Sequence, residues 1–449
     1  MRAFRSGRLA VGVCAEMALL VACNSYLPIS PSSTSAVSRE TASAFKVLHV
    51  FHAPARGWNP LAAVVADSSG NFYGETSQGG TPSSGGGCGT VFKVALDDGR
   101  YIESTLHRFR NKPDGCSPIG GLSIDSNGAI YGTTEFGGRT HGQGSGTVFK
   151  LSPRGSGYSY GVVYRFKDGR DGDWPVGGVL VDKSGVLYGA TQYGASYACA
   201  KNTEGCGTVY RLTPSRSTYT ETILYVFKGG NDGLLPISGL ATDSSGALYG
   251  TTWLGGGVGS TGIGTVYKLT PSGSGYLERV IHAFQGGPND GATPWAPVLV
   301  EPNGDVDGTT LYGGSNDKHC TAEGYGGNCG LVFRLTPSGS EYRESILYRF
   351  HGGRDGSQPQ APVMDDGGIL YGTTSDGSQF PCNGGCGTVF ALQPSGRGYA
   401  HTVLYQFNSR SGFLPRAGVI LNNGALYGTT YYQGRGRSYA GGSVFKLTP

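Results

Sequence analysis

Residues 239–276 have the sequence GLATDSSGALYGTTWLGGGVGSTGIGTVYKLTPSGSGY, and near copies of this stretch recur along the chain. Its tetrapeptide YGTT, or a variant of it, returns at intervals of roughly 60 residues, which indicates a repeat architecture. The tetrapeptide begins at seven positions: Tyr73, Tyr131, Tyr188, Tyr249, Asp307, Tyr371 and Tyr427. The chain therefore contains seven copies of one structural unit.

Each copy contains four short apolar runs of strand length, with the patterns GLxxD, LYGTT, GTVFKLT and YxExxLYxF. Turn-forming residues separate them: Asp-Ser-Ser-Gly, as at Asp67 and Asp243, lies between the first two runs, and TPSGSG lies between the last two. No segment has helical periodicity. Four antiparallel strands at this period are typical of a propeller blade, so the sequence predicts an all-β, seven-bladed β-propeller.

The two ends of the repeat array predict a closed ring. The array begins at residues 45–51 with FKVLHVF, a lone copy of the fourth strand, and the chain stops at Pro449 just after a third strand. Paired in one sheet, these fragments complete a blade and leave no open end. The predicted propeller therefore covers residues 45–449.

The composition agrees with this fold. Glycine supplies 80 of the 449 residues, and 38% of the chain is hydrophobic, 11% aromatic and only 15% charged. This composition favours strands and tight turns over helices, and it is too apolar for a disordered chain. The formal net charge is only +4, and the basic residues are scattered singly. No nucleic-acid partner is expected, because nucleic-acid-binding proteins gather Lys and Arg on one face.

The N-terminus has the pattern of an export signal. In residues 1–22, three arginines precede a short apolar stretch that ends in small residues and is too short to span a bilayer. The final LVAC, which ends at Cys23, is similar to a bacterial lipobox, so Cys23 is the expected lipidation site and the only link to the membrane. The alternative is ordinary cleavage, with Cys23 as a bystander. Residues 23–44 are rich in Ser, Thr and Pro, which predicts a flexible tether.

The pattern GLxxDSSGxLYGTT followed by GTVFKLTPSGSGY resembles the GloVer repeat of bacterial choice-of-anchor tandem repeat proteins. Its DxxGxLY part is also similar to the repeats of NHL-type and two-component-regulator propellers. The resemblance covers residues 45–449 and implies an exported protein with variable anchoring, but no particular molecular activity. Two copies depart from the pattern: the first has HAPARGWNP instead of GGxDGxxP, and the fifth has Asp307 instead of tyrosine. We expect these two blades to be locally irregular.

The cysteines of the repeats predict disulfides. One set lies one residue before the glycine that opens a third strand, and most of the others lie a few residues upstream in the same loops. An exported protein oxidises such neighbours. The predicted pairs are Cys199 with Cys206, Cys320 with Cys329, Cys382 with Cys386, and Cys88 with Cys116 in the loop that leads to the next blade. A zinc site is not predicted, because four-ligand spacing is absent.

Candidate binding residues lie on one predicted face of the ring. The loops from second to third strands and from fourth strands to the next blade emerge there, and they vary in length, as ligand-binding loops do. Aromatic side chains on this face suit sugar rings or peptide side chains, although they could instead fill gaps between blades. They are Trp58, Trp174 and Trp295 just before the innermost strands, and Trp253, Tyr312, Tyr431 and Tyr432 after the YGTT position.

The titratable residues of the repeat point to no catalytic site. His49, His107 and His282 occupy a repeat position that other copies fill with tyrosine, so they are interpreted as strand residues. The aspartates of the DG turns could contribute to a calcium site, but an isolated Asp-Gly is mainly a turn former. They are Asp114, Asp171, Asp232, Asp290 and Asp355. No catalytic residue, metal or cofactor is predicted.

We therefore predict a monomeric, lipid-anchored protein of the cell envelope, or otherwise a secreted one, that binds a glycan or a cell-surface protein through its loop face. Two alternatives stay open. One is a purely structural envelope protein. The other is a propeller glycosidase or polysaccharide lyase, which would need paired carboxylates near the ring axis.

Overall fold

The computed structural model describes residues 44–52, 54–80, 86–138, 144–167, 171–195, 199, 205–216, 218–257, 262–315, 320, 329–360, 364–380, 382, 385–396, 398–435 and 438–449. The repeats belong to the compact unit Ala42–Pro449. The predicted signal peptide, Cys23 and the predicted tether up to residue 43 lie outside the described residues. Among the described residues, no helix is long and apolar enough to cross a membrane.

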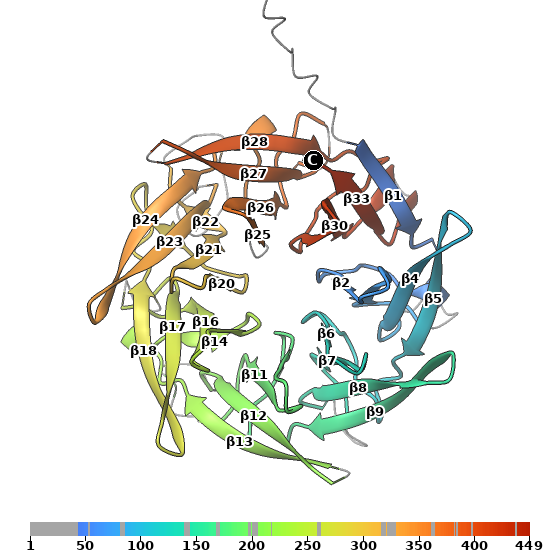
Figure 1. Ribbon diagram of the computed structural model, residues 1–449, viewed down its shortest axis with the longest axis horizontal. Coiled ribbons are helices and arrows are strands. Elements are labelled where there is room, and N and C mark those ends of the chain that lie inside the picture. The colour runs from blue at the N-terminus through green and yellow to red at the C-terminus, as the bar shows by residue number, and fades with distance from the viewer. Residues whose placement is uncertain are drawn as a thin grey trace, which may run out of the picture. The chain divides into compact units, whose positions relative to one another are not determined.

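The strands form seven blades of four antiparallel strands, arranged in a ring (Figure 1). From the innermost strand outward, blade 1 has β2 (Val65–Ala66), β3 (Phe72–Thr76), β4 (Thr90–Asp97) and β5 (Arg100–Arg108). Blade 2 has β6 (Ser123–Ile124), β7 (Ile130–Thr134), β8 (Thr147–Arg154) and β9 (Gly157–Arg165). Blade 3 has β10 (Leu180–Val181), β11 (Leu187–Thr191), β12 (Thr208–Ser215) and β13 (Thr218–Val226).

Blades 4 to 7 repeat this order. Blade 4 has β15 (Ala241–Thr242), β16 (Leu248–Leu254), β17 (Thr265–Ser272) and β18 (Gly275–Ala283), and blade 5 has β20 (Leu299–Val300), β21 (Val306–Thr310), β23 (Leu331–Ser338) and β24 (Glu341–Arg349). Blade 6 has β25 (Met364–Asp366), β26 (Ile369–Thr374), β27 (Thr388–Ser395) and β28 (Gly398–Gln406). Blade 7 has β29 (Ile420–Asn422), β30 (Ala425–Thr430), β33 (Ser443–Thr448) and β1 (Ala44–Val50).

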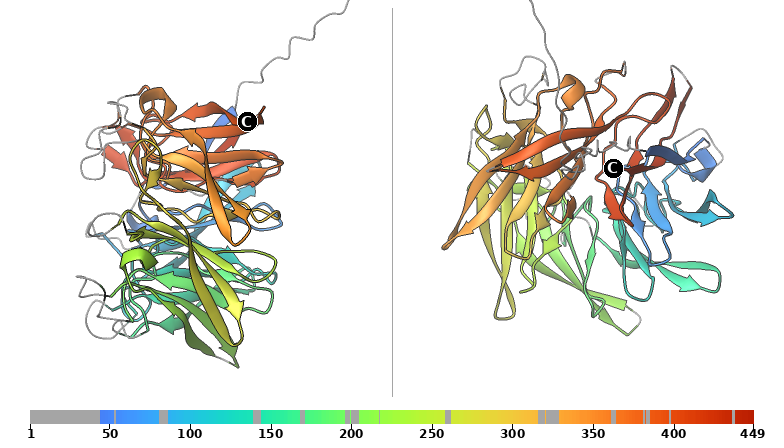
Figure 2. Two further views of the ribbon diagram at one scale, coloured as in Figure 1. Left: turned by 90° about the vertical axis from the view of Figure 1, so that its left-hand side faces the viewer. Right: turned by 45° about the horizontal axis from the view of Figure 1, so that its top comes forward.

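Short additional elements lie in the connecting loops. They are β14 (Leu234–Pro236), which pairs with β16, the pair β19 (Gly291–Ala292) and β22 (Tyr312–Gly313), the pair β31 (Gln433–Arg435) and β32 (Ser438–Ala440), and the 3-10 turns η1 (Pro54–Arg56), η2 (Gly230–Asp232) and η3 (Gly353–Asp355). The left view of Figure 2 shows the ring from its edge, with long hairpins of third and fourth strands projecting on one side.

The predicted closure of the ring is confirmed. The N-terminal β1 pairs antiparallel with the C-terminal β33, from Ala44 opposite Thr448 to Val50 opposite Ser443. A side-chain contact adds to this pairing, because the Thr429 hydroxyl of blade 7 donates to the Ala62 carbonyl of blade 1 at 3.0 Å. Pairing first and last strands in one sheet removes the free edge that an open array would expose.

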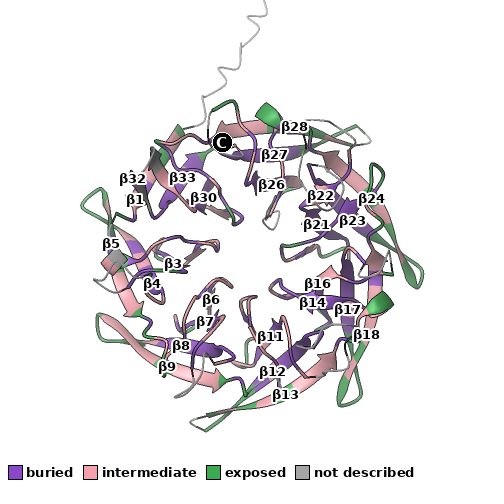
Figure 3. Cartoon of the chain, turned by 180° about the vertical axis from the view of Figure 1, so that it is seen from behind, coloured by how far each residue is buried: buried purple, intermediate pink, exposed green. Residues whose placement is uncertain are grey.

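The core lies within and between the blades, and the outermost strands are the most exposed (Figure 3). The glycine of YGTT is needed for this packing, because an aromatic ring of the neighbouring third strand lies against its backbone. A Cβ added at Gly132 would lie 2.5 Å from Cζ of Phe149, and one at Gly428 would lie 2.6 Å from Cζ of Phe445. Glycine therefore permits a close approach that any side chain would prevent.

The local irregularity expected of the first and fifth blades does not extend to the register of their strands. In blade 5, Asp307 lies opposite Arg334, in the register that places Tyr249 opposite Lys268 in blade 4. The strands of blade 1 also keep the common register. In blade 5 a bidentate ion pair between Arg334 and Asp307 replaces the cation–π contact between Lys268 and Tyr249. The strand therefore keeps its register with a charged pair in place of the tyrosine contact.

All four predicted disulfides are confirmed. They join Cys88 to Cys116, Cys199 to Cys206, Cys320 to Cys329 and Cys382 to Cys386. The first joins the loop before the third strand of blade 1 to the loop that leads into blade 2. Four disulfides indicate an oxidising, exported environment.

Candidate functional site

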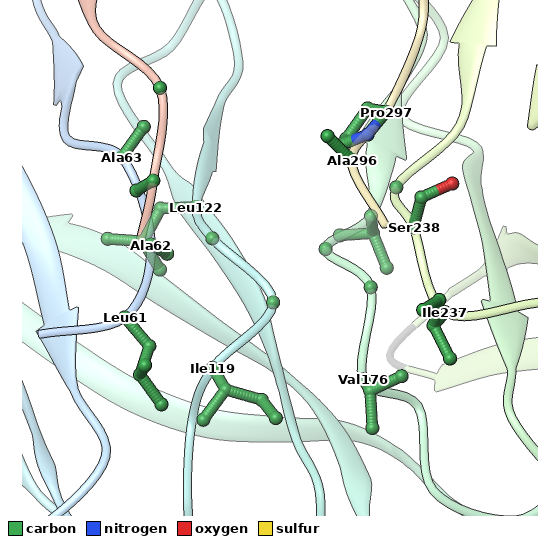
Figure 4. Close-up of a pocket in the computed structure, with 18 of the residues that line it drawn as sticks. Leu61, Ala62, Ala63, Ile119, Leu122, Val176, Ile237, Ser238, Ala296 and Pro297 are labelled. Atoms are coloured by element: carbon green, nitrogen blue, oxygen red, sulfur yellow. The ribbon is translucent and has the colours of Figure 1, made fainter. Parts of the chain in front are cut away.

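The seven blades converge on a cavity of about 460 Å³ at the ring axis. Its wall consists of the segments that lead into the innermost strands, such as 61–65, 119–123 and 176–180. Figure 4 shows side chains from blades 1 to 5, among them Leu61, Ile119, Val176 and Ile237, around this space. The cavity opens on the face that carries the loops between second and third strands, because Glu135 and Gln192 at the start of such loops also line it. This is the face on which the sequence placed a binding site.

A proline just before each innermost strand positions the cavity wall. Each proline packs against the glycine that opens the third strand of the preceding blade. A Cβ on Gly146 would lie 2.6 Å from Cδ of Pro175, and one on Gly442 would lie 2.8 Å from Cδ of Pro60, across the ring closure. The paired glycine and proline therefore set the spacing between neighbouring blades at the mouth of the channel.

The residue after this proline lines the cavity in every blade, and we call these seven the mouth residues. Their chemistry is divided around the ring. Blades 1 to 5 contribute apolar side chains, and blades 6 and 7 contribute polar ones. In blade order the mouth residues are Leu61, Ile119, Val176, Ile237, Trp295, Gln360 and Arg416. The mouth is thus an apolar arc facing a short polar sector.

The polar sector holds one exposed cation. The Arg416 guanidinium lies 5.0 Å from the ring centre of Tyr431, and among the described residues no carboxylate forms an ion pair with it. Burial raises the pKa of nearby Asp376 to about 6, an effect that Arg416 opposes. Gln360 donates to the Ser375 hydroxyl at 3.1 Å. An arginine held against an aromatic ring suits a carboxylate ligand, because its planar donors match both oxygens.

The predicted aromatic residues do not form one ring. Trp295 is 42% exposed and is the one among them that lines the cavity; it meets Trp253 edge to face, with centroids 5.9 Å apart. Trp174 lies between Phe136 and Tyr193, at 4.9 and 5.1 Å. The remaining predicted residues lie elsewhere in the loops: Tyr431 contacts Tyr432 at 4.4 Å, Tyr312 lies in β22, and Trp58 bridges to Gln78 and packs against Gly441.

Sequence reasoning missed the aliphatic mouth residues. A signal for them was present, since each follows a proline at the same position of its repeat. Aliphatic residues at such a position are ordinarily attributed to the core. Only the ring brings seven positions, roughly 60 residues apart in sequence, around one axis.

Glu75 is a buried carboxyl directly behind the cavity wall. It stands in blade 1 where blades 2 and 7 have Thr133 and Thr429, whose hydroxyls donate to a carbonyl of the next blade. Glu75 instead accepts a hydrogen bond of 2.6 Å from the Gly121 amide, which belongs to the cavity wall. Its Oε2 is buried and has no hydrogen-bond partner among the described residues. Burial raises the pKa of Glu75 to about 8, so it is chiefly protonated at neutral pH.

A second recurring cluster lies between the blades and not at the mouth. It contains a tyrosine or histidine of one fourth strand, the aspartate of the following DG turn, and a residue of the next blade's fourth strand; we call it the inter-blade trio. In the trio of blades 3 and 4, the Tyr225 hydroxyl donates to Asp232 at 2.5 Å, and Glu278 of blade 4 lies beside both. The aspartates that could have suggested calcium thus receive hydrogen bonds within the fold.

The histidines fill the tyrosine position of this trio, as the sequence predicted. His107 pairs with Val91 in the register in which Tyr164 pairs with Val148. His282, Asp290 and Glu344 place ligand-type atoms within 4.8 Å of one another. Because these are the positions of Tyr225, Asp232 and Glu278 in the preceding trio, we assign the cluster to the contact between blades 4 and 5.

The fold and the cavity define this protein as a closed seven-bladed β-propeller with disulfide-linked loops and an axial cavity of a size typical for small-ligand sites. The chain belongs to the Gloeobacter/Verrucomicrobia repeat family, which matches residues 32–199 and 319–449. No curated protein is similar enough in sequence to match this chain.

Several solved structures resemble the fold at low sequence identity. A candidate 6-phosphogluconolactonase from Bacteroides uniformis ATCC 8492 is 12% identical, with 84% of this chain and 93% of that chain covered and a TM-score of 0.49. A protein of unknown function from Dyadobacter fermentans DSM 18053 is 11% identical, with coverage of 91% and 98% and a TM-score of 0.41. At these identities and TM-scores, the similarity does not bear on what this chain binds.

Proposed function

We propose that this protein is an exported binding module of the cell envelope, attached through a lipid on Cys23, that holds a segment of another protein at the mouth of its channel. The observation that carries the proposal is the divided lining of the mouth. At the position of the mouth residues, five consecutive blades offer apolar side chains, and blades 6 and 7 offer Gln360 and Arg416. A ligand with an apolar body and a carboxylate matches this division, and a peptide segment can supply both.

The apolar arc favours a peptide over a sugar. Leu61, Ile119 and Val176 are partly buried and present aliphatic surface, which does not stack on a sugar ring as an aromatic face does. Fully burying one apolar side chain contributes about 1.5–3 kcal/mol. Arg416 would fix the orientation of the segment by pairing with its carboxylate.

A glycan at the rim is the second candidate ligand. Trp295 is 42% exposed and stands against Trp253, so its free face could support a sugar ring. The enzyme alternative has less support. Glu135 is the one carboxylate among the described lining residues, and it accepts a hydrogen bond from the Ser117 hydroxyl at 3.0 Å. Glycoside hydrolysis ordinarily needs two carboxyl groups at the site.

Parallel peptide and glycan arrays with the purified mature protein test the proposal. The peptides carry Leu, Val or Phe next to a free C-terminal carboxylate, next to an amidated C-terminus, or next to an internal Asp or Glu. We expect retention of carboxylate-bearing apolar peptides. Ile119→Asn and Arg416→Gln should each weaken the best peptide about tenfold or more, measured by calorimetry, because 1.4 kcal/mol corresponds to tenfold.

Matched controls lie away from the mouth. Leu277→Asn changes a leucine that is 67% exposed on β18, and Arg354→Gln changes an exposed arginine of η3. Both should leave the affinity unchanged. Glycan binding that is lost only in Trp295→Ala would favour the second candidate, and no retention on either array would favour a purely structural role.

A further inference from the structure

Three successive contacts between neighbouring blades, from blade 2 to blade 5, each place two carboxyl groups together. At each contact a glutamate of one fourth strand faces the DG-turn aspartate that follows the fourth strand of the preceding blade. The pairs are Glu221 with Asp171, Glu278 with Asp232, and Glu344 with Asp290. The three glutamates occupy one repeat position, since they lie opposite Leu212, Leu269 and Leu335 in their sheets.

The hydrogen bonds identify which carboxyl of each pair is ionised. Asp232 accepts from the Tyr225 hydroxyl at 2.5 Å and from the Lys228 amide at 2.7 Å, so both of its oxygens act as acceptors. Asp171 accepts in the same way from Tyr164 and from the Lys167 amide. Asp290 accepts from the Gln285 and Gly291 amides, each at 2.6 Å, and from His282 at 3.4 Å. Acceptors of this kind are carboxylates.

The glutamates have the opposite environment. Oε1 of Glu221, of Glu278 and of Glu344 is buried without a hydrogen-bond donor among the described residues. A buried carboxylate oxygen beside a second carboxylate would carry uncompensated charge, whereas a protonated one can donate to its neighbour. We propose that these three contacts are carboxylic acid–carboxylate pairs, each holding one proton in mildly acidic solution, and that the ring loosens there when the protons leave.

The other inter-blade trios support this assignment, because none of them leaves two carboxyl groups together. Tyr160 and His401 replace the glutamate beside Asp114 and Asp355. Glu103, at the same position in blade 1, faces Arg56 at 3.5 Å instead of an aspartate. Where Ser411 replaces the aspartate, Phe45 stacks on Tyr405. Among the described inter-blade trios, two carboxyl groups therefore come together only in the three proposed pairs.

The charged and titratable groups around each glutamate are few. Glu221 faces Asp171, Lys167, Tyr164 and Tyr210. Glu278 faces Asp232, Lys228, Tyr225 and Tyr267. Glu344 faces Asp290, His282 and Arg349. Desolvation is the largest effect, and the neighbouring aspartate adds to it, so that the pKa of each glutamate rises to about 7.

The sign of the pH dependence follows from this rise. An unfolded glutamate titrates near its ordinary pKa of about 4.5, so between pH 4.5 and 7 the folded state binds more protons than the unfolded state. Stability from these pairs is therefore fully present below about pH 4.5 and is lost as the pH rises to about 7. Each pair should increase the unfolding constant by up to about tenfold per pH unit in this window.

Urea unfolding of the full chain from pH 4.5 to 8, in buffers with EDTA so that no cation replaces a proton, tests the proposal. The variant E221Q/E278Q/E344Q places an amide donor where each acid proton would lie. We expect the variant to lose the part of the fall in stability between pH 4.5 and 7 that the three glutamates contribute, whereas the part that Glu75 contributes should remain. The control E341Q changes a glutamate of β24 whose side chain is 72% exposed, and it should retain that fall.

An unchanged pH dependence in the triple variant would overturn the proposal. If the triple variant does not fold, the wild type and the single variant E278Q still decide the question. Calorimetry in buffers of different ionisation enthalpy measures the protons that each releases on unfolding at pH 6. Unfolding of E278Q should release roughly one proton fewer than unfolding of the wild type, which would support the pair. An equal release would refute it.

Discussion

Replacing Asp307 by tyrosine, the residue of the other blades, should destabilise the protein unless Arg334 is changed as well. The Arg334 guanidinium donates to both oxygens of Asp307 at 2.7 Å, and the Asp307 side chain is fully buried. Arg334 itself is only 19% exposed. Breaking a buried pair by removing one partner costs about 3–5 kcal/mol, and because Glu301 and Asp305 still face Arg334, we expect about 3 kcal/mol for Asp307→Tyr.

The double variant Asp307→Tyr with Arg334→Lys should recover most of this loss. It recreates the contact of blade 4, where the Lys268 ammonium lies 5.0 Å from the centre of the Tyr249 ring in the same register. We expect the double variant to lie within about 1 kcal/mol of the wild type, which gives a coupling of about 2 kcal/mol. Urea unfolding of the four proteins at pH 7 measures it. A double variant no more stable than Asp307→Tyr would refute the expected coupling between positions 307 and 334.

Two further predictions concern the ring. Glu75→Gln should stabilise the protein by about 3 kcal/mol at pH 7, because the pKa of Glu75 in the folded protein is raised to about 8. It should also remove a fall in stability between pH 4.5 and 8 in urea unfolding. The control Glu341→Gln changes a side chain that is 72% exposed and should have neither effect. Gly442→Ala should lower the melting temperature by several degrees, because the glycine has φ +98 and its Cβ would lie 2.8 Å from Cδ of Pro60 at the ring closure. Gly273→Ala, in an open hairpin turn at φ +58, is the matched control and should have the smaller effect in calorimetry.

Much of the fold could be predicted because its determinants are local and repeated. DSSG and TPSGSG turns, alternating apolar runs and a cysteine one residue before a third strand each act within a few residues. Closure was also predictable, since a lone fourth strand at one end and a missing one at the other define a single pairing. The regular register of β21 could not be predicted from Asp307 alone, because its partner Arg334 lies 27 residues later in the chain.

The candidate site was less accessible to sequence reasoning. The aromatic residues of the loops were predicted as the binding residues, but only Trp295 among them lines the cavity. The mouth residues have no local signature beyond the preceding proline, and an isoleucine such as Ile119 in one repeat reveals nothing of the six others. Glu75 likewise looks like an ordinary variant of YGTT until its burial behind Gly121 is known.

The sequence by itself determined the blade, the number of blades, the ring closure and the disulfide pairs, because each depends on short-range patterns or on counting copies. Only the tertiary structure decided which side chains meet at the axis and between the blades, because those neighbours are roughly 60 residues apart and come together through the ring alone. The ring, and no single repeat, divides the mouth into an apolar arc and a polar sector. It also brings together the carboxyl pairs at the three successive blade contacts from blade 2 to blade 5.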